Sequence, residues 1–446
     1  MYDILTLQTL LGGKFMYRKI MKYLEEWKAS PHRKPLILQG ARQVGKTYSI
    51  LEFGRTHYEN VAYFNFESTP KLNQTFEENI SPDYLIPILS HIAGQTIIKE
   101  KTLIVFDEVQ LCERALTSLK YFCEEASDYH IIVAGSLLGV AVNRDKFSFP
   151  VGKVDMKTLY PMDIEEFMIA LGEDMLVDKI RECFANDTPM PSALHEAALK
   201  LYREYLVVGG MPECVMQYTN TKDFILVRNT QNTILASYLN DMSKYNKTNE
   251  IKKTRLCYDN ITVQLSKKNT RFQYKLIKKG ARASEFENAI EWLNLSGIVS
   301  QIYKVEQIKK PLENYRDIDA FKIYVSDLGL LSAKKDLAAI DIIYMVVEIN
   351  DFKGGMVENY ANTSLTISGH KTYYWESDRG AEVDFIIQRD GKLIPIEVKS
   401  ADNTKAKSLR LYIETFKPDY AIKLSTKNFG FENNIKTVPL YAAFCI

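Results

Sequence analysis

One run of residues in the N-terminal third has the types and spacing needed to hold the phosphates of a nucleoside triphosphate. It has the form GxxxxGK[ST] and consists of Gly40, Ala41, Arg42, Gln43, Val44, Gly45, Lys46 and Thr47. It stands between an apolar run and a helical pattern, where backbone N–H groups can close on phosphates at a helix N-terminus. Lys46 would neutralise the β and γ phosphates, and the Thr47 hydroxyl would be a ligand of Mg²⁺. The run predicts a site for ATP and Mg²⁺.

A pair of carboxylates follows the apolar run 103–106 and completes this chemistry. Asp107 and Glu108 would lie at the carboxyl edge of a parallel sheet, where ligands bind. We expect Asp107 to hold Mg²⁺ through water, and Glu108 to orient and polarise the attacking water. Alone, such a pair would more often end a strand in solvent, but the preceding loop favours the catalytic interpretation. Ser136, after the apolar run 130–134, is expected near the γ phosphate as a sensor.

No arginine finger can be assigned from the sequence. Arg144 and Lys153 lie downstream of the loop, and each is more simply interpreted as a solvated charge. Because the N-terminal region has no obvious arginine of its own for this role, we expect a homo-oligomer in which a neighbouring copy supplies one.

A second set of candidate residues lies in a hairpin near the C-terminus. Asp390-Gly391 between two alternating runs predicts a two-residue turn. The pairing that follows places Asp384 opposite Glu397 and Glu382 opposite Lys399, all on one face. The other face is expected to be the core face, with Val383, Phe385 and Ile387 against Ile394, Ile396 and Val398.

Two carboxylates placed opposite each other repel unless a cation lies between them. We therefore expect a second metal site formed by Asp384, Glu397 and Glu358, the last on a helical pattern, with Lys399 as the catalytic group that stabilises developing charge on a phosphate. The alternative is a surface hairpin whose charges are solvated or paired as Glu382 with Lys399.

The elements that must position these residues fall into four zones, which predict an α/β multidomain protein. Residues 15–158 alternate apolar runs with helical patterns, as in a P-loop NTPase with a parallel sheet. Residues 159–250 have helical spacing and predict an all-α lid or connector. Residues 251–340 give two helices and two short strands, the order of a winged helix. Residues 341–446 form a last α/β domain.

Composition excludes several classes of protein. The 446 residues are too many for a single hydrophobic core. The 57 basic and 56 acidic residues nearly cancel, so the net charge gives no indication of nucleic-acid binding. Six scattered cysteines without a CxxC pair argue against zinc and against a disulfide framework. No targeting signal or membrane-length apolar run is present, so we expect a cytoplasmic protein without a membrane partner.

Six motifs in order along the chain carry a family resemblance: GARQVGKT, VFDEVQ, AGSLL, LYPMDIEEF, YLVVGGMPECV and EVDFIIQRDGKLIPIEVKS. Together they resemble a prokaryotic family of AAA-type, archaeal-ATPase-like ATP-binding proteins. The C-terminal domain of that family, of unknown function, looks like the PD-(D/E)xK nuclease fold. The resemblance extends from about residue 18 to 400 and implies the same phosphate-binding, acidic and nuclease-like residues. Where the family usually shows Gly-Arg before LYPL, this chain has Gly152-Lys153 before LYPM, and lysine lacks the planar fork of arginine.

Two functions remain open from the sequence. The first is an ATPase that acts on nucleic acid, with DNA as the partner of the winged-helix and nuclease-like regions. Basic residues in the winged-helix region favour it, although solvated helix charges explain them equally well: Lys267, Lys268, Lys275, Lys278, Lys279 and Arg282. The second is a nucleotide-dependent switch or scaffold for a protein partner, with a catalytically silent C-terminal domain.

Overall fold

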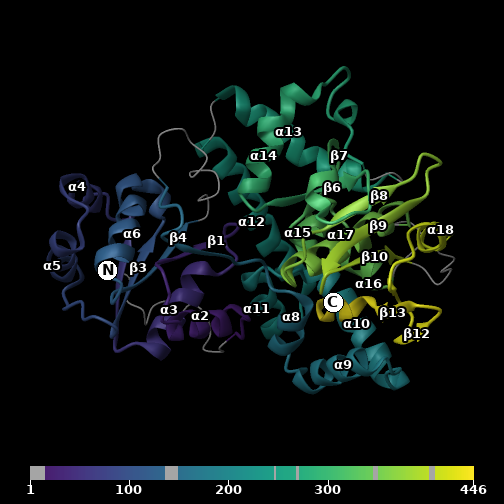
Figure 1. The fold of residues 1–446 in the computed structure, drawn as a ribbon, viewed down its shortest axis with the longest axis horizontal. Coiled ribbons are helices and arrows are strands. Elements are labelled where there is room, and N and C mark those ends of the chain that lie inside the picture. Colours follow the sequence, from purple (N-terminus) through teal and green to yellow (C-terminus); the bar gives the residue numbers. More distant parts are fainter. Residues whose placement is uncertain (1–15, 136–148, 246–247, 268–270, 345–349, 401–406) are drawn as a thin grey trace.

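The N-terminal part of the chain is a five-stranded parallel sheet between helices (Figure 1). A computed structural model describes residues 16–135, 149–245, 248–267, 271–344, 350–400 and 407–446. The strand order is β2-β3-β4-β1-β5, so the strand that leads into the phosphate-binding loop lies inside the sheet, between β4 and β5. The strands are β1 (Leu36–Gln39), β2 (Asn60–Asn65), β3 (Thr102–Asp107), β4 (His130–Gly135) and β5 (Asp155–Thr158).

Continuous apolar runs in β1, β3 and β4 arise because both faces of this sheet are covered. Ile37, Ile104 and Ile131 pack in one apolar cluster, whereas their neighbours Leu38 and Leu103 pack in another. The flanking helices are α2 (Ile20–Ala29), α3 (Lys46–His57), α4 (Leu72–Glu78), α5 (Pro82–Ala93) and α6 (Glu113–Glu125).

The structure confirms four of the expected strands, but the sequence analysis missed β5. Its residues, Asp155–Thr158, are all at least partly exposed, so no apolar run marks them. Pairing with β1 in parallel register is what makes this segment a strand.

The region expected as an all-α lid is helical throughout. It contains α8 (Ile164–Ala170), α9 (Asp174–Asn186), α10 (Ser192–Val208), α11 (Pro212–Thr221) and α12 (Phe224–Tyr245). The break between α10 and α11 falls at Gly209 and Gly210, as predicted. A β carbon at Gly210 would lie 1.9 Å from the carbonyl oxygen of Met162, so only glycine fits this turn.

The next region has the order of elements expected for a winged helix. Two helices, α13 (Thr248–Leu265) and α14 (Ala283–Leu295), precede the hairpin of β6 (Val299–Val305) and β7 (Arg316–Val325). The hairpin, however, is one edge of a larger sheet, because β6 also pairs in parallel with β8 (Tyr373–Glu376).

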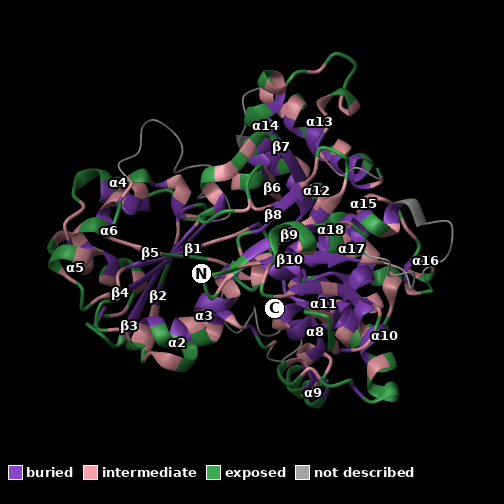
Figure 2. Cartoon of the chain, turned by 45° about the vertical axis from the view of Figure 1, so that its right-hand side comes forward, coloured by how far each residue is buried: buried purple, intermediate pink, exposed green. Residues whose placement is uncertain are grey.

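That larger sheet has eight strands in the order β12-β13-β11-β10-β9-β8-β6-β7. It therefore joins the segments expected as two separate domains on either side of residue 340. The remaining elements are α15 (Leu328–Lys334), α16 (Ala339–Ile343), α17 (Asn350–Ile367), β9 (Glu382–Arg389), β10 (Lys392–Val398), α18 (Lys407–Phe416), β11 (Ala421–Ser425), β12 (Gly430–Glu432), β13 (Ile435–Pro439) and the 3₁₀ helix η5 (Leu440–Cys445). Figure 2 shows buried strands between more exposed helices.

The predicted turn of the C-terminal hairpin is confirmed, and so is its register as far as Phe385, but the ladder ends before the predicted pairs of Asp384 with Glu397 and of Glu382 with Lys399. Lys392 pairs with Arg389, and the pairs continue to Ile396 opposite Phe385. The prediction of one core face was wrong for Val383, which packs with Ile386 and not with Phe385. The register of β9 against β8 shifts at this point, and this irregularity accounts for the change of side.

Asp327 connects this sheet to the turn between α10 and α11. Its buried carboxylate accepts hydrogen bonds from the backbone N–H of Gly210 at 2.6 Å and of Leu330 at 2.8 Å. Burial raises the pKa of Asp327 from 3.8 to about 6, although these N–H donors act in the opposite direction.

Within the described residues, every helix is too short or too polar to span a membrane.

The raised pKa of Asp327 predicts a pH-dependent stability. The native state binds this proton more tightly than the unfolded chain, so the contribution is complete below about pH 4 and is lost as the pH rises to about 6. Two pH units correspond to on the order of 3 kcal/mol. We expect Asp327→Asn to remove this part of the pH dependence of the free energy of unfolding, measured by urea titration between pH 4 and 7. The control Asp259→Asn changes an exposed carboxylate and should leave it in place. Equal slopes in wild type and Asp327→Asn would contradict the assignment.

Candidate functional site

The phosphate-binding loop turns sharply between β1 and α3 because two of its glycines adopt positive φ. Gly40 has φ 146° and Gly45 has φ 91°. A β carbon at Gly40 would lie 2.1 Å from the carbonyl oxygen of Leu159, which follows β5. The loop therefore fits against the end of β5 only with glycine at its first position. The helix α3 begins at Lys46, and its first N–H groups are free to bind a ligand at the site.

Lys46 is held inside this loop. Its ammonium donates to the carbonyl oxygens of Gly40 at 2.9 Å and Ala41 at 2.8 Å, and its side chain is buried. Burial lowers its pKa to about 8, while Glu108 and Asp107 favour the charged form. A phosphate would supply the negative charge that this buried ammonium lacks.

The two predicted ligands of Mg²⁺ lie together at the carboxyl edge of the sheet. The Thr47 hydroxyl donates to Oδ2 of Asp107 at 2.9 Å, and the hydroxyl of Tyr63 donates to the same oxygen at 2.8 Å. Asp107 is the last residue of β3 and is 5% exposed. The oxygen set of one hydroxyl and one carboxylate fits Mg²⁺, which keeps several waters and is completed by phosphate oxygens.

Glu108 lies beside Asp107 in a left-handed conformation, with φ 51°. Burial raises the pKa of Glu108, and the side-chain amide of Gln110, which donates to its carboxylate, opposes that rise. A carboxylate with a raised pKa at this edge suits a group that accepts a proton from water.

Residues from three other segments contact the phosphate-binding loop. The guanidinium of Arg42 forms an ion pair with Asp241 of α12, and the hydroxyl of Tyr238 donates to the carbonyl of Arg42 at 3.2 Å. On another side, a β carbon at Gly45 would lie 3.5 Å from Cγ of Pro212 at the start of α11. The helical region thus touches the loop at both ends.

Arg18, which precedes α2, completes this contact from the N-terminal side. Its guanidinium donates to the carbonyls of Val44 at 2.8 Å and Tyr160 at 2.7 Å, and its Nε lies 3.2 Å from Oε1 of Glu166. Both side chains of the ion pair are almost fully buried. Burial raises the pKa of Glu166, and the charge of Arg18 opposes that rise.

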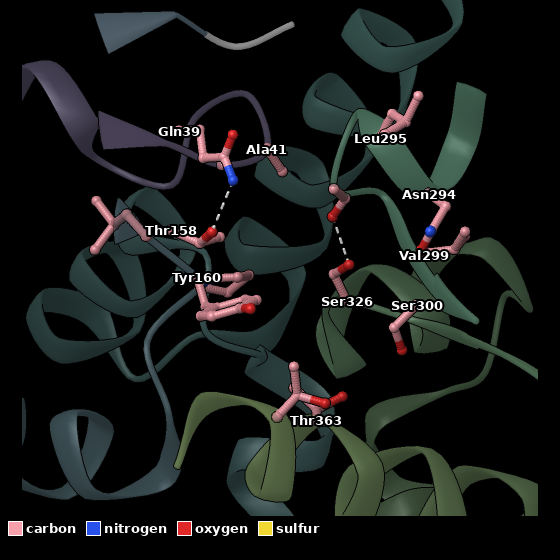
Figure 3. A pocket seen from close by; sticks show the side chains of 15 residues that line it. Gln39, Ala41, Thr158, Tyr160, Asn294, Leu295, Val299, Ser300, Ser326 and Thr363 are labelled. Carbon is pink, nitrogen blue, oxygen red and sulfur yellow. Dashed lines mark hydrogen bonds between the residues drawn. The ribbon is translucent and has the colours of Figure 1, made fainter. Parts of the chain in front are cut away.

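A cavity of about 280 Å³ adjoins the first residues of the loop (Figure 3). Gln39 and Thr158 line one side, where the Gln39 amide donates to the Thr158 hydroxyl at 3.1 Å. Ser300 and Thr363, from β6 and α17, lie on the other side. The cavity therefore separates the N-terminal sheet from the C-terminal one beside the nucleotide site.

Among the remaining predicted residues near the phosphate-binding loop, Lys153 alone lies within the part of the chain that the structure describes. Ser136 and Arg144 lie outside the described residues. Lys153 forms an ion pair with Glu124 of α6 at 2.8 Å and is 41% exposed, as expected of a solvated charge.

In the C-terminal region the structure brings together only part of the predicted metal site. Oxygen atoms of Glu358, Glu382 and Asp384 lie within 4.8 Å of one another. Glu397 is not part of this group and pairs instead with Lys399. The backbone pairing of β9 with β10 ends at Phe385, and Asp384 accepts a hydrogen bond from the N–H of Val398 at 2.7 Å with its side chain.

A lysine that the sequence analysis missed lies within this acidic cluster, defined as Glu358, Glu382 and Asp384. The ammonium of Lys322 is 2.6 Å from Oε1 of Glu358 and also contacts Glu382. The alternative of a surface hairpin expected an ion pair of Glu382 with Lys399, but in the structure Glu382 pairs with Lys322 and Lys399 pairs with Glu397. With Lys322 in place, the cluster does not fit a divalent cation, since a cation already occupies the carboxylates.

Three segments of the chain match known protein families. Residues 32–168 match the family described as AAA domain. This N-terminal region is therefore similar to an AAA domain, and it is called the AAA domain below. Residues 199–341 and 353–443 match two families described as domains of unknown function, DUF8612 and DUF4143.

Several solved structures resemble the chain weakly. The Aeropyrum pernix ORC1 protein in complex with DNA is 12% identical, with a TM-score of 0.31, over 73% of this chain and 94% of that one. AMPPCP-bound DnaA from Aquifex aeolicus is 15% identical, with a TM-score of 0.24, over 66% and 93%. C. elegans PCH-2 is 12% identical, with a TM-score of 0.29, over 48% and 66%. No curated protein matches the chain.

Some signals for the missed residues exist in the sequence. Lys322 is a charge inside the apolar run of β7, which is unusual unless a partner is buried with it. Glu166 follows Asp163 by three residues, as in a capping box, which the structure confirms at the start of α8. Nothing near Arg18 marks it, because its partners are more than 25 residues away.

Arg18 is predicted to matter for both stability and nucleotide binding. Arg18→Met leaves the buried Glu166 without its cation, which should cost about 3–5 kcal/mol of unfolding free energy. Adding Glu166→Gln should restore part of that loss, as a double-mutant cycle by urea unfolding would show. The control Arg55→Met removes an exposed ion pair and should cost less than about 1 kcal/mol. Equal effects of the two arginine changes would contradict a special role for Arg18.

Proposed function

We propose that the AAA domain binds ATP with Mg²⁺ and hydrolyses it. The observation that carries this proposal is the contact between the Thr47 hydroxyl and Asp107, at 2.9 Å, beside a buried Lys46 and the carboxylate of Glu108. All four groups lie where β1 and β3 end, on the edge at which open parallel sheets bind ligands.

Each group has one task in this mechanism. The N–H groups at the start of α3 and the ammonium of Lys46 bind the phosphates, and Lys46 must leave the carbonyls of Gly40 and Ala41 to do so. Thr47 and Asp107 would hold Mg²⁺, which would neutralise phosphate charge when bound. Glu108 orients a water molecule and accepts its proton.

We propose that hydrolysis is coupled to the rest of the chain through the contacts on the loop. A γ phosphate would attract Arg42 and so compete with Asp241 for the same guanidinium. Pro212 and Tyr238 would follow the loop because they touch it. The arginine that completes the site would come from a second copy of the chain.

We favour nucleic acid as the object of this coupling. Five basic side chains near α13 and α14 are exposed and could contact a phosphate backbone, while Lys268 lies outside the described residues: Lys267, Lys275, Lys278, Lys279 and Arg282. The winged-helix order of elements in this region and the resemblance of the C-terminal sequence to the PD-(D/E)xK nuclease fold support the same partner.

A nucleotide-dependent switch for a protein partner is the second candidate. The contacts of Asp241, Tyr238 and Pro212 with the loop favour it, since they link nucleotide binding to the helical region without any action by the C-terminal domain.

Two variants test the ATPase. Glu108→Gln should bind ATP with unchanged affinity and lose hydrolysis by at least 100-fold, because it removes the proton acceptor but keeps the shape. Lys46→Ala should weaken ATP binding itself. Isothermal titration calorimetry measures ATP affinity and phosphate release measures hydrolysis, so together they distinguish the effects of the two variants. Full turnover by Glu108→Gln would contradict the proposed role.

Salt dependence tests the nucleic-acid partner. Binding of the full chain to a DNA duplex should weaken as salt rises, and Lys275→Gln and Lys279→Gln should each reduce the slope of log K against log salt by about 1. Lys99→Gln, an exposed lysine on the AAA domain, is the control and should not change the slope. Absence of salt-dependent binding by the wild type would favour the protein partner.

A further inference from the structure

We propose that Lys322 is the resident cation of the acidic cluster, so that Glu358, Glu382 and Asp384 are held together by an ammonium group and not by a divalent metal ion. The cluster then serves as an internal ion-pair centre of the C-terminal sheet.

The first observation that supports the proposal is the position of Lys322. It lies in β7, in a run of buried residues, and its side chain is 1% exposed. The ammonium lies 2.6 Å from Oε1 of Glu358 on α17 and contacts Glu382 on β9. It also lies 4.9 Å from the centre of the Tyr374 ring on β8. Lys322 therefore contacts three other elements of the domain at once.

The second observation concerns the carboxylate oxygen of Glu358 that accepts hydrogen bonds. Oε1 of Glu358 accepts from both Lys322 and the hydroxyl of Tyr324, so this oxygen already has two donors. A metal ion that bound this oxygen would compete with both donors. A divalent cation a few ångströms from a buried ammonium would also be strongly repelled, because little water screens the two charges there.

The balance of charge carries the third step. The ammonium of Lys322 places one positive charge among the carboxylates of Glu358, Glu382 and Asp384. This charge reduces the negative charge that would otherwise demand a metal ion. Lys399 does the same for Glu397 beside the cluster.

This arrangement gives the cluster a structural role. Lys322 belongs to the segment that matches one family of unknown function, 199–341, and Glu358 and Glu382 belong to the segment that matches the other, 353–443. The ion pairs therefore connect the two segments to each other inside one sheet. Removing the charge of Lys322 would leave buried carboxylates that only another cation could satisfy.

The first test needs only the folded full chain without nucleotide. Mn²⁺ binding is counted by the electron paramagnetic resonance of the free ion, for wild type and for Asp384→Asn. The proposal expects the same number of bound ions in both, because neither binds Mn²⁺ at the cluster. One fewer ion in Asp384→Asn would overturn it, and this comparison does not involve the ATP-binding residues.

The second test creates the site that Lys322 excludes. Lys322→Met keeps the length of the side chain and removes its charge, so this variant should bind one additional Mn²⁺ and show a higher melting temperature with the ion than without it. Adding Asp384→Asn should abolish both effects. Lys334→Met, which removes another partly buried lysine of an ion pair, is the matched control and should gain no ion. A folded Lys322→Met that gains no ion would overturn the proposal. If Lys322→Met does not fold, the comparison of wild type with Asp384→Asn decides.

Discussion

The nucleotide site depends on how the backbone between Gly40 and Gly45 is held. A loop that exposes its N–H groups to phosphate leaves its carbonyls to be satisfied elsewhere. Here Arg18 donates to the carbonyl of Val44, Tyr238 donates to that of Arg42, and Lys46 donates to those of Gly40 and Ala41. Side chains from outside the AAA domain's sheet thus complete the loop, so its conformation cannot be independent of them.

The same dependence continues toward the C-terminal sheet. Pro212 lies beside Gly45 of the loop, and the turn that precedes it is fixed by the buried carboxylate of Asp327, the N-cap residue of α15 just after β7. Lys322 lies five residues earlier on that strand, within the acidic cluster. The phosphate-binding loop is therefore connected through neighbouring residues with the C-terminal sheet, although the two sheets share no strand.

Local patterns allowed most of the N-terminal site to be predicted. The loop, Asp107 and Glu108 each follow a buried strand, and their meeting follows from parallel strands that end at one edge. The hairpin register followed from Asp390-Gly391 alone. What could not be predicted depends on distant partners: Arg18 with Glu166, Arg42 with Asp241, and Lys322 with Glu358 are separated by 148, 199 and 36 residues. The register shift between β8 and β9 also could not be predicted, and with it the packing of Val383 with Ile386.

Hydrogen–deuterium exchange of the Glu108→Gln protein, with and without ATP and Mg²⁺, tests the central claim that nucleotide binding is transmitted through these contacts. Residues 40–47 should become protected on binding. If the account is correct, exchange should also change in segments 209–215 and 238–245, which contain Pro212, Tyr238 and Asp241. Protection confined to 40–47 and 107–108, with no change in either helical segment, would contradict it.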